Sequence, residues 1–275
     1  MNLLGKSLAV GAMALAATGA QATIKGGVNN QSTEMFFNLW NPVAEVSYAL
    51  DLGVVHNDFF QYDRNTGVST TQAMSWTIDA STSTAFAQFL SATQPGTDLF
   101  YNIASSNAST TGANFAAFEN WGVLRTSNDA NISKVTPTEV SAMVSNINFR
   151  IIDLNTKLNV SGGDTANNFD SFSVAQDASY FVNNWGDSMN NSTKFSSIGQ
   201  EGEGNTLGFY WMNRELAQVN TTGIEYLGDW SFVIDYSAKT ASLNFAPVPL
   251  PAAVWLFGTG LIGLLGAGRR KSAAA

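Results

Sequence analysis

The sequence is a succession of short apolar and aromatic runs separated by turn-forming residues, and this spacing constrains the fold more than any other feature. Breaks such as Asn41-Pro42 and Asn65-Thr66-Gly67 interrupt the runs. Short runs of this composition between Asn, Pro and Gly are typical of strands. We therefore expect strands at 35–40, 46–55, 74–78, 99–104, 121–125, 172–175, 180–185, 206–211, 223–226, 230–236 and 242–245.

Two segments show helical spacing instead. In residues 81–93 the apolar side chains recur every three or four positions, and Gln94-Pro95-Gly96 ends the segment. The second segment opens with Thr136-Pro137-Thr138-Glu139, which has a capping threonine, a proline at the first helical position and a glutamate three residues after the cap. Its apolar residues are Val140, Met143, Val144, Ile147, Ile151, Leu154 and Leu158. The pattern predicts a mainly β protein, an antiparallel β-sandwich-like body with about two packed helices.

The N-terminus has the pattern of a secretory signal. Lys6 gives a positive start, residues 8–17 form an apolar stretch too short to span a bilayer, and Ala20 and Ala22 form an A-x-A site for signal peptidase. We expect residues 1–22 to be removed and the mature chain to begin near Thr23. The sequence contains no cysteine, so an exported body must be stabilised by its core without disulfides.

Charge and residue usage exclude several classes of function. Without the signal and the C-terminal tail, nine cations face 21 acids, a net charge of −12, which nucleic acid would repel. The six Trp and many Phe of the body argue against disorder. His56 is the single histidine. One histidine without cysteine rules out thiol–imidazole catalysis and an all-histidine metal site. We expect no metal and no cofactor, and calcium binding by Asp164 and Asp170 stays open.

The C-terminal segment is apolar and ends in cations. Residues 252–268 carry no charge over 17 positions, and Arg269, Arg270 and Lys271 follow directly. A helix of this length would span about 25 Å, enough for a thin bilayer core. Cations beyond such a span remain on the cytoplasmic side. We expect a transmembrane helix at 252–268 that stops transfer, with the body outside and the basic tail 269–275 inside.

A specific motif precedes this helix. Val248-Pro249-Leu250-Pro251-Ala252, then the short apolar helix, then the basic cluster, resembles the VPLPA variant of the PEP-CTERM sorting signal of exported proteins in Gram-negative bacteria. The resemblance covers about 25 residues at the end of the chain. It implies recognition by an exosortase, cleavage near the prolines, and release to the cell surface or extracellular matrix, often beside exopolysaccharide and biofilm functions.

The N-terminal signal pattern and the C-terminal resemblance together divide the chain into the signal peptide 1–22, an extracellular β-rich body 23–246 and the sorting signal 247–275. The precursor would cross the inner membrane only transiently, with its body in the periplasm. Pro249 and Pro251 favour extended backbone, which a protease cleft requires. A permanent C-terminal anchor remains the alternative to sorting.

The body itself leaves three hypotheses open. The leading one is a non-enzymatic surface or matrix protein, with exopolysaccharide as a candidate partner. The second is a carbohydrate-binding module, which exposed aromatic rings would favour. The third is a secreted hydrolase that uses paired carboxylates such as Glu201 and Glu203, although this spacing in a Gly-rich stretch is typical of a solvated turn. His56 we interpret as structural or exposed. The tryptophans that could stack on sugar are Trp40, Trp76, Trp121, Trp185, Trp211 and Trp230.

Overall fold

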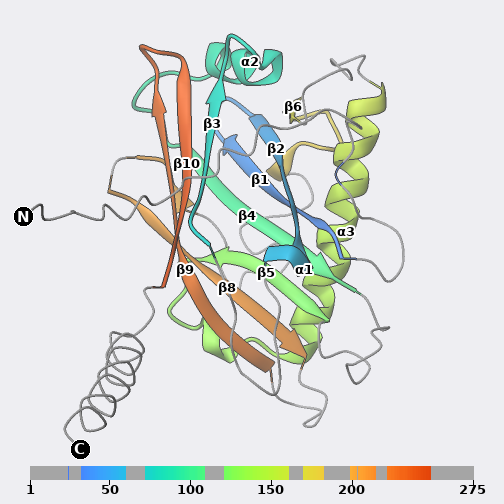
Figure 1. Ribbon diagram of the computed structural model, residues 1–275. Helices are drawn as coiled ribbons and strands as arrows, with labels where there is room; N and C mark the ends of the chain where they lie inside the picture. The colour runs from blue at the N-terminus through green and yellow to red at the C-terminus, as the bar shows by residue number, and fades with distance from the viewer. Residues whose placement is uncertain are drawn as a thin grey trace, which may run out of the picture.

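The computed structural model describes residue 24 and residues 32–59, 72–108, 121–160, 170–182, 199–202, 204–214 and 222–248. In these residues the protein is mainly β (Figure 1). The strands are β1 (Glu34–Asn41), β2 (Val46–Val55), β3 (Met74–Asp79), β4 (Phe100–Asn107), β5 (Gly122–Ser127), β6 (Asp170–Val174), β7 (Gly199–Gln200), β8 (Thr206–Arg214), β9 (Thr222–Asp235) and β10 (Thr240–Pro247). The helices are α1 (His56–Phe59), α2 (Thr84–Ala92), the 3-10 turn η1 (Ile132–Lys134) and α3 (Pro137–Val160).

All the strands belong to one antiparallel sheet. Its order is β3-β10-β9-β8-β5-β4-β1-β2-β6, with β7 paired to β4. The sheet curls until β9 faces β1 and β4, so that the Phe37 and Phe232 rings lie 4.8 Å apart. The β-rich class is thus confirmed, but the two-layered sandwich is replaced by a single curled sheet. Alternating side chains look the same in both architectures, because alternation does not say which strands pair.

Aromatic side chains fill the concave side of the sheet. Tyr101 donates a hydrogen bond to the carbonyl of Trp230 at 3.2 Å across this interior. Helix α2 covers one end, where Ser83 caps it and the buried Phe86 and Phe89 point into the core. The principal aromatic residues of this core are Phe37, Tyr48, Phe59, Phe86, Phe89, Tyr101, Phe209, Trp211, Trp230, Phe232 and Phe245.

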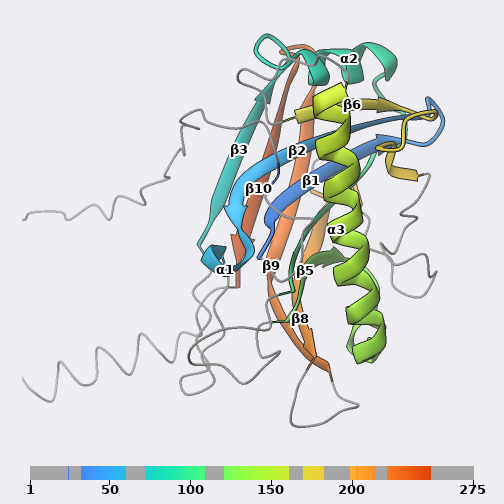
Figure 2. The same cartoon turned by 90° about the vertical axis from the view of Figure 1, so that its right-hand side faces the viewer.

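Helix α3 lies on the convex side of the sheet, across β1, β4, β5 and β8 (Figure 2). The expected capping box is present: the Glu139 carboxylate accepts a hydrogen bond from the Thr136 backbone N–H at 2.8 Å. The predicted apolar stripe is the buried face, and Met143, Ile147 and Ile151 are fully buried. This confirms the sequence prediction of a long helix packed on a sheet.

Two expected strands at the end of the chain form one. The runs at 223–226 and 230–236 belong to the continuous strand β9, which is bulged opposite Phe209 and Tyr210. Gly228, with φ of 145°, lies in this bulge, and a Cβ there would be 2.2 Å from the Ala246 carbonyl oxygen. Glycine is required by this close approach, which the sequence presents as an ordinary break between two runs.

The expected strand at 180–185 is wrong over the part that the structure describes. Tyr180–Val182 follow a turn and do not join the sheet. Phe181 instead stacks on Trp40, with ring centroids 4.1 Å apart, and its N–H donates to the Ser47 hydroxyl at 3.2 Å. Tertiary packing against β1 and β2 therefore decides the conformation of a segment whose composition favours a strand.

The predicted targeting segments lie mostly outside the described residues. Ala20, Ala22, Pro249–Ala252 and the basic cluster at 269–271 are all outside, as is the expected transmembrane helix at 252–268. In the part of the chain that is described, no helix is long and apolar enough to cross a membrane. Val248 is described, and its N–H donates to the Leu227 carbonyl at 3.0 Å. The backbone hydrogen bonds of the sheet thus reach the first residue of the predicted sorting motif.

Candidate functional site

The tryptophans do not form an exposed platform in the described part of the chain. Trp40, Trp211 and Trp230 are buried, and Trp76 and Trp121 are half-buried. Trp185 lies outside the described residues. The described tryptophans therefore serve the core, as large apolar rings do most often.

The carboxylates singled out from the sequence are not brought together as a catalytic pair. Glu201 accepts a hydrogen bond from the Ile234 N–H at 2.9 Å and so holds β9, while Glu203 lies outside the described residues. A different pair is joined directly: Asp51 and Glu34 share a hydrogen bond between adjacent strands. Direct contact leaves no room for a sugar, because glycosidase carboxylates stand about 5–10 Å apart.

His56 is a buried structural residue, as expected. Its exposed fraction is 1% and its Nδ1 lies 3.0 Å from the Ser105 hydroxyl. Burial lowers the pKa of His56 to about 3, and a hydrogen bond with the Ser105 backbone opposes this only in part. The ring is therefore neutral at ordinary pH and has no access to a substrate.

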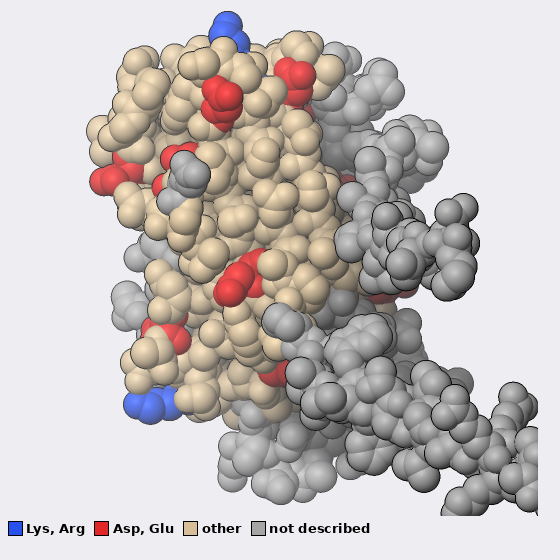
Figure 3. Space-filling view, turned by 60° about the vertical axis from the view of Figure 1, so that its left-hand side comes forward, with Lys and Arg blue, Asp and Glu red and all other residues tan. Residues whose placement is uncertain are grey.

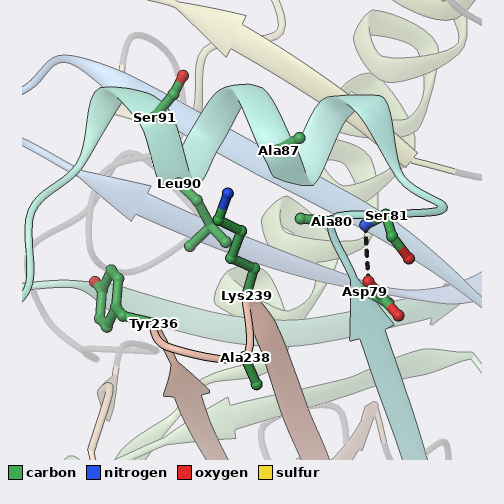
Figure 4. A pocket seen from close by; sticks show the side chains of 9 residues that line it. All are labelled: Asp79, Ala80, Ser81, Ala87, Leu90, Ser91, Tyr236, Ala238 and Lys239. Carbon is green, nitrogen blue, oxygen red and sulfur yellow. Dashed lines mark hydrogen bonds between the residues drawn. The ribbon is translucent and has the colours of Figure 1, made fainter.

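Two of the hollows in the described part of the chain are candidate sites. The first, of about 420 Å³, lies between α2 and the turn that joins β9 to β10 (Figure 4). Leu90 and Lys239 extend into it side by side, and Asp79 accepts the Ser81 N–H at 2.7 Å on the opposite wall. We call this the α2 hollow. Alanine, leucine and serine side chains make up most of its lining, so it offers few groups that could fix the orientation of a ligand.

The second hollow, of about 370 Å³, is more open, and its lining includes aromatic, carboxylate and amide side chains that can contact a ligand. It lies where the end of β5 and the loop after it meet β8 and the bulge of β9. We call it the tyrosine hollow. Its lining residues are Ser127, Asn128, Asp129, Ala130, Thr206, Gly208, Tyr210, Tyr226 and Asp229.

Two tyrosine rings form the aromatic part of the tyrosine hollow. Tyr210 and Tyr226 are paired across β8 and β9, with centroids 5.3 Å apart and planes at 48°. Tyr226 is 45% exposed, whereas Tyr210 packs partly on the core beneath α3. Aromatic rings held at such an angle present one apolar face and one ring edge to a ligand.

Asp229 holds the Tyr226 hydroxyl and supplies an acceptor to the tyrosine hollow. The Tyr226 hydroxyl donates a hydrogen bond to the Asp229 carboxylate. Burial, then Asp229, raise the pKa of both Tyr226 and Tyr210 above the ordinary value. Both phenols are therefore neutral at any physiological pH. The Tyr226 proton is given to Asp229, whose remaining lone pairs can accept hydrogen bonds from ligand hydroxyls.

Gly208 leaves the space that the Tyr210 ring occupies. A Cβ at position 208 would lie 2.9 Å from Tyr210 Cε2 and 3.2 Å from the Ser127 carbonyl oxygen. Any side chain at position 208 would displace the Tyr210 ring rather than the strand backbone, because a side chain moves more easily than a strand within a sheet. Glycine in β8 thus shapes the floor of the tyrosine hollow.

The loop after β5 forms the other wall. The Asp129 N–H donates to the Ser127 hydroxyl at 3.1 Å, and Asp129 accepts the Asn131 N–H at 2.7 Å, so the loop holds its own shape. The lining includes two carboxylates and neither lysine nor arginine. Figure 3, which turns the side of β9 and β10 toward the viewer, shows a mostly uncharged surface with separated acidic groups.

The tyrosine hollow was not predicted from the sequence. Tyr210 and Tyr226 stand in separate apolar runs and lie opposite each other only because the bulge in β9 shifts the register. Comparisons with known proteins give no independent guide to its role, since no family model, curated protein or solved structure matches the chain.

Proposed function

We propose that the protein is an exported, non-enzymatic surface or matrix protein, sorted by an exosortase, whose body binds a neutral polysaccharide in the tyrosine hollow. The paired rings of Tyr210 and Tyr226 beside Asp229 carry the binding part of the proposal. The motif at Val248–Ala252, the apolar segment and the basic cluster carry the sorting part.

The chemistry of a sugar ring fits this arrangement. A pyranose has apolar C–H faces, which pack on aromatic rings, and an edge of hydroxyls that needs donors and acceptors. The tyrosine hollow supplies ring surface from Tyr226 and Tyr210, acceptors from Asp229 and Asp129, and the amide of Asn128. Because the hollow is open, a polymer could continue beyond it at both ends.

Charge selects among polysaccharides. Two carboxylates without a lysine or arginine in the lining repel an anionic polymer, and the body as a whole is acidic. A neutral glucan or mannan would meet no such repulsion. We therefore assign the tyrosine hollow to neutral sugar units rather than to uronic acids.

The position of the hollow suits a protein that is held by its C-terminus. Gly228 and Asp229 pair directly with Pro247 and Ala246, at the point where the chain leaves the sheet toward the sorting motif. A ligand bound at Asp229 would thus lie close to any surface to which the C-terminus of the body is attached.

Replacing Tyr226 with alanine is expected to weaken polysaccharide binding about tenfold, the scale of one lost aromatic packing contact. Affinity electrophoresis through gels that contain dextran, galactomannan or mixed-linkage β-glucan measures the retardation. Gly208→Ala should weaken binding as well, because its Cβ displaces the Tyr210 ring.

Lys239→Ala, in the α2 hollow, is the matched control and should leave retardation unchanged. Alginate gels test the charge argument. Retardation by alginate alone, or equal retardation of Tyr226→Ala and the parent chain, would contradict the assignment of the tyrosine hollow.

The sorting part is tested separately by the intact mass of the protein from its native host, with cell fractionation. We expect a chain that begins at Thr23 and ends near residue 250, recovered outside the inner membrane. Leu250→Ala with Pro251→Ala should keep the full C-terminus in the membrane fraction. A wild-type mass that extends to Ala275 and is confined to the inner membrane would leave a permanent anchor instead.

A further inference from the structure

Helix α3 has a second stripe, opposite the one that it buries. Along Pro137–Lys157 every exposed residue is uncharged, and these residues follow the spacing of four and three that brings side chains onto one line. The stripe, which we call the outer seam, consists of the exposed Thr138, Ser145, Phe149, Ile152 and Thr156 together with the half-buried Ala142.

The outer seam points directly away from the sheet. At 100° per residue, its centre lies about 180° from the buried face formed by Val140, Met143, Ile147, Ile151 and Leu154. Phe149 is 60% exposed and Ile152 is 42% exposed. These two are adjacent on the helix surface, whereas the other exposed large apolar residues of the described chain are scattered. Exposed apolar side chains gathered on one helix face mark an interaction surface.

Charge limits what can cover the outer seam. The charged residues Glu139, Asp153 and Lys157 lie to one side of it and Arg150 lies beneath, so the seam itself is neutral. Two copies of a strongly acidic body repel each other over most of their surfaces. Contact along the outer seam lets two copies approach through a line of residues that carries no charge.

The sizes of the side chains define the orientation. The N-terminal half of the outer seam has the small side chains of Thr138, Ala142 and Ser145. The C-terminal half has the large side chains of Phe149 and Ile152. A two-fold axis near residue 147 would place Phe149 of one copy against Ser145 of the other, and Ile152 against Ala142. A parallel arrangement would place Phe149 against Phe149 and leave the small residues facing a gap. Self-complementarity about a two-fold axis is the property of an isologous dimer contact.

We propose that the protein forms a two-fold dimer in which the outer seams of two α3 helices pack antiparallel. The contact spans about five helical turns, near the lower limit of about 1,000 Å² for a specific interface. A modest affinity follows, with dissociation constants in the micromolar range. This inference is independent of the sugar proposal, because the outer seam and the tyrosine hollow share no residue.

The lack of cysteine in the chain allows a direct test. With the two-fold axis near residue 147, the cysteines of two Ser145→Cys chains are offset by about 6 Å along the helices. The axes of the two helices lie about 8–10 Å apart. A short bis-maleimide added to the full chain in intact cells should join them into a covalent dimer. Positions 138 and 156 would lie opposite each other about the same axis. Co-expression of Thr138→Cys and Thr156→Cys chains should therefore also give a cross-linked dimer that contains one chain of each kind.

Thr156→Cys alone is the control on the same seam. Two copies of it would lie about 27 Å apart along the axis in the antiparallel dimer, beyond the reach of the reagent. Cross-linking of Thr156→Cys with itself would show parallel packing and overturn the proposal, and so would the absence of a Ser145→Cys dimer.

A second measurement keeps the cysteine at position 145 and changes the outer seam itself. Phe149→Lys places two like charges in the contact and is expected to abolish the Ser145→Cys cross-link, whereas Asn148→Lys, one residue outside the seam, should preserve it. Both variants alter a solvent-facing part of the helix and should fold. Equal cross-linking in the two would refute the assignment of the outer seam.

Discussion

Replacement of Arg150 by alanine is expected to lower the free energy of unfolding by about 3–5 kcal/mol, the scale of breaking a buried charged network from one side. The guanidinium group is fully buried beneath α3. It donates to Asn38 Oδ1 at 3.2 and 3.0 Å and to the Ser179 carbonyl, and it lies 5.5 Å from the centre of the Phe181 ring. Truncation leaves Asn38 and Ser179 without these donors and opens a cavity between helix and sheet.

Urea denaturation followed by intrinsic fluorescence measures the loss, since Trp40 stacks on Phe181 next to this site. Lys157→Ala is the matched control on the same helix. Lys157 meets Asp177 at 2.7 Å, but both side chains are about one-quarter exposed, so that loss should stay below about 1 kcal/mol. Similar losses for the two variants would mean that Arg150 does not hold α3 on the sheet.

Asp51→Asn is expected to stabilise the protein at pH 8 by about 2–4 kcal/mol and to have little effect near pH 4. Burial first, then the neighbouring Glu34 charge, raise the pKa of Asp51 to about 7 in the folded state. An unfolded aspartate ionises near pH 4. Between these values the folded chain holds a proton that the unfolded chain has released. Stability therefore falls as the pH rises from about 4 to 7, and asparagine cannot ionise.

The readout is the difference between Asp51→Asn and the parent chain across this pH range. The pH profile of the parent chain alone is ambiguous, because His56 also contributes to it. The pKa of His56 is about 3 in the folded protein and near 6.5 in the unfolded chain. Its titration therefore lowers the stability of the protein as the pH falls below about 6.5, the opposite direction to Asp51. Subtraction cancels this contribution. A constant difference from pH 4 to 8 would show that Asp51 is ionised in the folded protein.

The sequence was informative where a single element carries its own signal. The capping box at Thr136–Glu139 predicted the start of α3, and the apolar spacing predicted its buried face. Most strands were placed within a few residues, as with Val46–Val55. These features depend on local periodicity and on local hydrogen bonds, both of which can be read along the chain.

Features that depend on contacts between distant segments of the chain could not be predicted from the sequence. The single curled sheet, the bulge that opposes Tyr210 to Tyr226 and the burial of Arg150 all arise from contacts between distant segments. The sequence suggested tryptophans as sugar-stacking residues because of their size, yet size is also what places Trp230 in the core. Exposure, which decides whether a ring can meet a ligand, depends on the register between strands.

The adjacency of the tyrosine hollow to the end of β10 has a mechanical consequence. Asp229 and Gly228 pair with Ala246 and Pro247, so the hollow and the C-terminal exit lie at the open end of the same hairpin. Tension between an attached C-terminus and a bound polymer would enter and leave the protein across this one pair of strands. The strands would then separate by peeling, one backbone pair after another, instead of shearing all pairs together. Such a protein would yield at low force while β1, β4 and α3, which do not line the hollow, remain unstrained.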